Sequence, residues 1–127
     1  MSHDSGLSPE ELAVERFAQS LMVVRDAAIR QCDWTLNVDG STSMHTRWRH
    51  WAERDEIREV LTESIPDTVD QTIGVLLNAI DNGEIELGWR TDSGWSSLRE
   101  LGEGVLTDMY GGSPGWRAYS TERALPW

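Results

Sequence analysis

The sequence contains no lysine, and each of its 11 basic residues is an arginine. Against them stand 22 acidic residues, so the formal net charge is −11. The negative charge is weakest over residues 47–66, which carry −1, and strongest over residues 67–127, which carry −6. Non-specific binding to nucleic acids or to anionic membranes needs a positive field, which this composition lacks. We therefore expect neither nucleic acid nor a membrane as a partner, and a basic protein in their place.

Cysteine is almost absent as well, since Cys32 is the only one and no disulfide can form within the chain. A single thiol is typical of proteins from a reducing compartment, which predicts a cytoplasmic location. No apolar run approaches the length of about 20 residues that a membrane-spanning helix needs. The N-terminus also lacks the basic and then apolar pattern of a secretory signal.

The apolar pattern predicts a mostly helical α+β fold. Ser8 and Pro9 mark a helix start, and apolar residues at helical spacing continue that helix to Cys32. Pro66 should separate two further helices, and Ser97 should cap a fourth. Alternating residues predict two short strands. The expected helices span residues 9–32, 51–64, 67–82 and 98–109, and the expected strands span residues 84–90 and 116–120.

These elements predict about four helices packed on a two- or three-stranded sheet in the C-terminal half, because so small a sheet is not stable alone. Residues 1–7 are expected to form a flexible N-terminus, and residues 8–127 a single globular domain. Residues 33–48 allow either a short hairpin that turns at Asp39-Gly40 or an ordered loop. A change of structure is predicted between Trp48 and Asp55, because one straight helix there would be apolar on two opposed faces.

The residues that could carry chemistry match no known arrangement. His45 and His50 lie five positions apart, so they point in different directions on a helix or a strand and cannot share a metal ion. They are interpreted as surface or network histidines. Ser93 and Ser113 lie in turn-like segments without the flanking residues of a nucleophile elbow or a phosphate loop. We therefore assign no catalytic, cofactor-binding or metal-binding residue, expect no cofactor, and favour a protein that is not an enzyme.

Seven tryptophans are many for 127 residues. Trp89 and Trp116 have the pattern of core residues. Trp48 and Trp51 are predicted to attach the junction around them to the core, with an interface role as the alternative. Exposed tryptophans beside charged residues are typical of interface anchors. The residues predicted to contact a partner are Trp48, Trp51, Trp95, Trp127, Asp92, Glu100 and Glu103.

Three classes of function remain open. The first is a small acidic protein-binding module, in particular an inhibitor of a basic protein. Its physical character is similar to that of small acidic bacterial immunity proteins, although no family motif is matched. The second is a structural or homo-oligomeric accessory protein. The third is a small-ligand-binding protein or enzyme with an aromatic pocket that uses scattered residues such as His50, Arg90, Asp92 or Tyr119.

Overall fold

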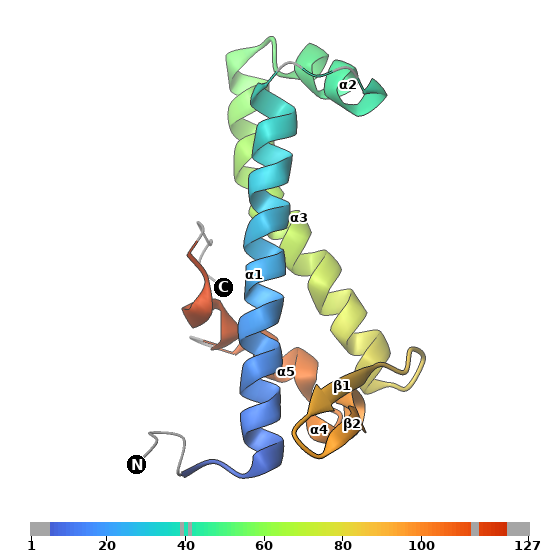
Figure 1. Cartoon of the computed structure of the whole chain (residues 1–127). Helices are drawn as coiled ribbons and strands as arrows, with labels where there is room; N and C mark the ends of the chain where they lie inside the picture. The colour runs from blue at the N-terminus through green and yellow to red at the C-terminus, as the bar shows by residue number, and fades with distance from the viewer. Residues whose placement is uncertain (1–5, 39, 41, 113–114, 122–127) are drawn as a thin grey trace.

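The computed structural model describes residues 6–38, 40, 42–112 and 115–121. In chain order its elements are α1 (Pro9–Asn37), α2 (Ser43–Trp51), α3 (Asp55–Asp81), β1 (Gly88–Thr91), β2 (Gly94–Ser97), α4 (Leu98–Leu101), α5 (Leu106–Gly111) and the 3₁₀ helix η2 (Gly115–Tyr119). The long helices α1 and α3 pack against each other (Figure 1). Helix α2 lies at one end of this pair, and the sheet, α4 and α5 lie at the other. The predicted α+β class is confirmed.

Helix α1 begins where the sequence predicts. The Glu11 N–H donates to the Ser8 hydroxyl at 3.0 Å, and the Ser8 N–H donates to the Glu11 carboxylate at 3.3 Å. The helix continues past the predicted end at Cys32. Leu36 lies two turns after Ile29 on the same face of the helix, and both are fully buried in one apolar cluster. None of the described helices is long and apolar enough to cross a membrane.

The prediction of a hairpin or loop over residues 33–48 is wrong. The first part of this region completes α1, and the last part forms α2, whose first turn is capped by the Thr42 hydroxyl. The buried or half-buried positions His45, Trp48 and Ala52 are three or four residues apart, which is the spacing of a helix and not of a strand. The proposed turn residue Asp39 lies outside the described residues. The predicted change of structure before Asp55 is confirmed.

The predicted break at Pro66 is also wrong. Helix α3 runs through this proline as one helix of 27 residues, and in Figure 1 it changes direction near its middle. Proline removes one backbone donor and bends a helix, at a cost of about 3 kcal/mol. Burial of Pro66 and Ile65 on the side that packs against the neighbouring helices offsets that cost. The predicted helix end at Asn82 is confirmed.

The C-terminal half differs from the prediction in its strands. β1 and β2 form an antiparallel hairpin that turns at residues 91–94, in the turn-like segment around Ser93, so the second strand precedes α4. The strand predicted over residues 116–120 is instead η2, and Trp116 packs its ring against Phe17 and Tyr110 in the core. The predicted core positions Trp89 and Trp116 are confirmed as packed against this core.

The helix predicted over residues 98–109 is divided into α4 and α5. Gly102 and Gly104 lie between the two helices, and Gly104 has a φ of +72°. The Asp81 carboxylate accepts hydrogen bonds at 2.9 Å from the backbone N–H groups of Leu106 and Thr107 and so caps the start of α5. The end of α3 therefore determines where α5 begins.

Two apolar clusters hold α1 and α3 together. The cluster at the sheet end contains residues such as Met22 and Leu77, and the cluster at the α2 end is built on Ile29, Leu36, Ala52 and Ile65. Between them along both helices lies a buried polar network. The fully buried Arg25 donates to both carboxylate oxygens of Asp70, from Nε at 2.5 Å and from Nη2 at 3.2 Å. The Tyr110 hydroxyl also donates to Asp70, at 2.6 Å.

Candidate functional site

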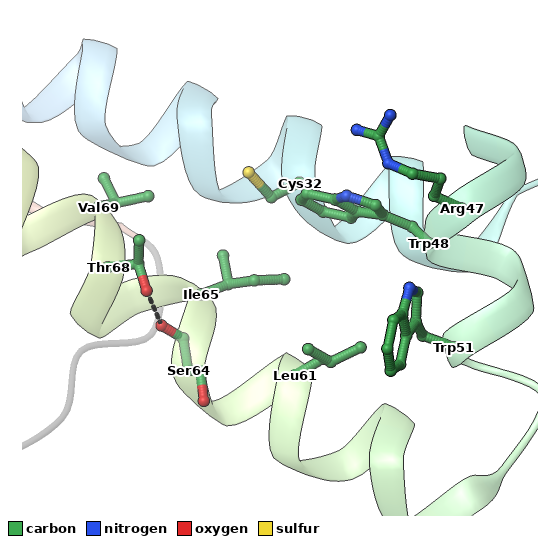
Figure 2. Close-up of a pocket in the computed structure, with 9 residues that line it drawn as sticks. All are labelled: Cys32, Arg47, Trp48, Trp51, Leu61, Ser64, Ile65, Thr68 and Val69. Atoms are coloured by element: carbon green, nitrogen blue, oxygen red, sulfur yellow. Dashed lines mark hydrogen bonds between the residues drawn. The ribbon is translucent and has the colours of Figure 1, made fainter. Parts of the chain in front are cut away.

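A pocket of about 500 Å³ opens where α1, α2 and α3 meet. We call it the α2-end pocket (Figure 2). Its lining is mostly apolar and consists of Cys32, Arg47, Trp48, Trp51, Leu61, Ser64, Ile65, Thr68 and Val69. Figure 2 shows the side chains of Trp48, Trp51, Leu61 and Ile65 pointing toward the same space. The volume lies within the range of about 300–1,000 Å³ that is usual for ligand pockets.

Local helix geometry explains this arrangement. Trp48 and Trp51 are three residues apart, so α2 presents both indoles on one face. Leu61 and Ile65 are four apart and lie on one face of α3, and the lining continues along that face to Thr68. The connection between α2 and α3 is short, which brings the two faces together across the pocket.

The polar groups of the pocket favour binding over acid–base chemistry. The Ser64 hydroxyl donates to the Val60 carbonyl at 2.7 Å, and the Thr68 hydroxyl donates to the Ser64 carbonyl at 2.9 Å. Burial, together with the charge of Asp33, raises the pKa of the Cys32 thiol, which keeps it protonated. The described lining contains no carboxylate and no imidazole, so an apolar group can enter this pocket but meets no general acid or base.

The two tryptophans of the pocket differ in burial. Trp48 is half-buried and packs against the apolar cluster at the α2 end, in line with its predicted role at the junction. Trp51 is 58% exposed, so the prediction that it is fixed in the core is wrong. Trp51 therefore lines the pocket with one part of its indole and faces solvent with the rest.

The other residues predicted to contact a partner lie at the opposite end of the molecule. Trp95 is 73% exposed on β2, Asp92 is in the turn of the hairpin, and Glu100 and Glu103 belong to α4 and the turn after it. Trp127 lies outside the described residues. Among the described residues, the predicted set is therefore divided into two groups at opposite ends of the molecule, and Trp48 and Trp51 share the lining of one pocket.

Two further clefts lie at this sheet end. One, of about 740 Å³, is lined by Glu10, Glu11, Glu15 and Glu103, with Trp116 and Tyr119 among its aromatic neighbours. The other, of about 520 Å³, is lined in part by Arg16, Arg90 and Asp92. The scattered residues of the enzyme hypothesis do not converge, because Arg90 and Asp92 share one cleft, Tyr119 lines the other, and His50 is on α2.

The histidines take the two roles expected of them. His45 is buried, with Nδ1 at 2.7 Å from the Thr42 hydroxyl and its ring edge-to-face against Trp34. His50 is exposed, and its Nδ1 lies 3.9 Å from the carboxylate of Glu53, which is also exposed. Over the described part of the chain, no group of three or more His, Cys, Asp and Glu side chains is placed to hold a metal ion.

Comparisons with protein-family models, with curated proteins and with solved structures found no match. The geometry of the α2-end pocket is therefore the basis for a proposed function. The sequence predicts a role for the two tryptophans of the pocket, whereas the walls supplied by Cys32, Leu61 and Ile65 are not among the predicted residues. The i, i+4 spacing of Leu61 and Ile65 on α3 can be read from the sequence, but the helix face that meets α2 depends on the packing of the three helices.

Proposed function

We propose that the protein is a small protein-binding module that holds apolar side chains of a partner protein in the α2-end pocket. The observation that carries this proposal is the 58% exposure of Trp51 beside an apolar pocket of about 500 Å³. Burying an exposed indole and the apolar walls around it supplies the hydrophobic contribution that anchors most interfaces. A polar substrate is a poorer fit, because the pocket lacks several convergent polar groups to orient it.

The test is a capture experiment followed by measurement with the purified partner. The immobilised chain is exposed to an extract of its native host, and a captured protein is purified and titrated by calorimetry. We expect Trp51→Ala to weaken binding by about tenfold or more, as at interface hot spots. Trp95→Ala is the matched control, since Trp95 is an equally large exposed indole at the other end of the molecule. Equal affinities for the wild type and Trp51→Ala would contradict the proposal.

A second candidate function is the binding of a basic protein at the sheet end. The cleft lined by Glu10, Glu11, Glu15 and Glu103 favours it, because an arginine or lysine stem can pack on the exposed ring of Tyr119 while its head meets carboxylates. Such a site suits the inhibitor hypothesis, with the charge of −11 steering the partner toward it.

An oligo-arginine peptide is a direct probe of this second candidate. Glu103→Gln should weaken peptide binding more than Glu63→Gln, which removes the same charge from the exposed face of α3. Equal effects of the two substitutions would indicate attraction to the net charge alone and would exclude a specific site in the cleft.

A further inference from the structure

We propose that the partner at the α2-end pocket is a second copy of this chain. The two copies are related by a twofold axis, and Trp51 of each covers the pocket of the other. This inference rests on the proposed function of the pocket and names its partner. Twofold dimers use one surface twice, so the surface must be complementary to itself.

The distribution of charge selects this end of the molecule for self-association. Two copies that each carry −11 repel, and residues 1–46 and 67–127 contribute −4 and −6 of that charge. Residues 47–66 carry only −1 and include the C-terminal half of α2 and the first part of α3. Copies of this chain can therefore approach each other at the α2 end with the least electrostatic cost.

The same end also carries charges of both signs on separate elements. Helix α2 contains two arginines and no acidic residue, whereas α3 contains seven acidic residues and one arginine. Arg49 donates to the Asn37 carbonyl at 2.8 Å and so caps the end of α1. Arg47 at the edge of the pocket has no hydrogen bond or ion pair with any described residue. It is the cation available to a second copy.

The edge of the pocket on α3 supplies the matching anion. Val60, Ser64 and Asp67 are all exposed and are spaced four and three residues apart, so they form one row on the helix. Ser64 belongs to the pocket lining, Val60 is 60% exposed, and Asp67 stands at the far end of the row. In a twofold dimer, Trp51 and Val60 become buried, and Arg47 of each copy pairs with Asp67 of the other.

Sedimentation analysis of the purified chain tests this inference over a concentration series. We expect a monomer–dimer equilibrium, with a dissociation constant that Trp51→Ala raises about tenfold or more and Trp95→Ala leaves unchanged. Arg47→Glu and Asp67→Arg should each weaken the dimer, because each places like charges opposite one another at both contacts. An equimolar mixture of these two variants should restore it, since the mixed dimer has one reversed pair and one original pair. Circular dichroism checks that each variant is folded.

Two results would overturn the inference. One is a wild type that stays monomeric up to about 1 mM, a concentration at which even a dimer with a dissociation constant of about 1 mM would be populated. The other is a mixture of Arg47→Glu and Asp67→Arg that associates no better than either variant alone. Neither result would disprove the proposed function, because a different protein captured through Trp51 would still occupy the pocket. Loss of both self-association and Trp51-dependent capture would disprove the two together.

Discussion

Replacing Asp70 by alanine should destabilise the protein more than the removal of any exposed carboxylate. Asp70 accepts two hydrogen bonds from the fully buried Arg25 and one from the Tyr110 hydroxyl. Without Asp70, the Arg25 guanidinium remains buried with Asp26, 3.1 Å away, as its nearest carboxylate. Breaking a buried ion pair by removing one partner costs about 3–5 kcal/mol. Because Asp26 still compensates part of the charge, we expect a loss of about 3 kcal/mol.

Urea unfolding followed by tryptophan fluorescence measures this loss, and calorimetry should show a melting temperature lower by about 10 °C. Glu63→Ala is the control, since Glu63 is an exposed carboxylate on the same helix and should change stability by less than about 0.5 kcal/mol. Asp70→Asn keeps the shape of the side chain and an acceptor for Tyr110 but loses the charge. Its loss of stability should therefore lie between those of Asp70→Ala and Glu63→Ala. A loss below about 1 kcal/mol for Asp70→Ala would refute the view that the buried Arg25 guanidinium depends on Asp70 to compensate its charge.

Three further predictions concern the ends and turns of the fold. Ser8→Ala removes the cap of α1 and should cost about 1 kcal/mol in urea unfolding, whereas an unchanged midpoint would show that the cap is dispensable. Gly102→Ala should destabilise by about 1–3 kcal/mol, because the new Cβ would lie on the buried Leu106 side chain, and a wild-type melting temperature would contradict this packing. Burial alone would raise the pKa of Asp26, but hydrogen bonds from Ser120, Thr121 and Arg25 together lower it. The stabilisation from Asp26 is therefore complete above the ordinary aspartate pKa of about 4 and is lost as the pH falls through the lower folded value. Amide exchange at the Thr121 N–H, which donates to Asp26 at 2.9 Å, should accelerate in that range relative to the core, and uniform protection would argue against it.

The elements that the sequence predicts correctly are those with local causes. Ser8 and Glu11 cap α1 through side chains only three residues apart, and the turn at residues 91–94 depends on its own four residues. Trp116 is buried and Trp89 is half-buried against the same core, as expected of apolar residues that follow the local helical or strand pattern. Composition likewise determines the net charge and its uneven distribution along the chain.

The tertiary structure decides the features that depend on distant residues. Pro66 is a local helix breaker, yet α3 continues through it because its neighbours Ile65 and Val69 pack against the α2-end cluster. The start of α5 is determined by Asp81 from another helix, and the Arg25–Asp70 pair joins residues 45 positions apart. The α2-end pocket arises in the same way. The sequence alone marks Trp48 and Trp51 as unusual. Only the packing of α1, α2 and α3 places both beside an apolar pocket and leaves Trp51 exposed. The physical reason is that the burial of a side chain depends on which helix faces meet.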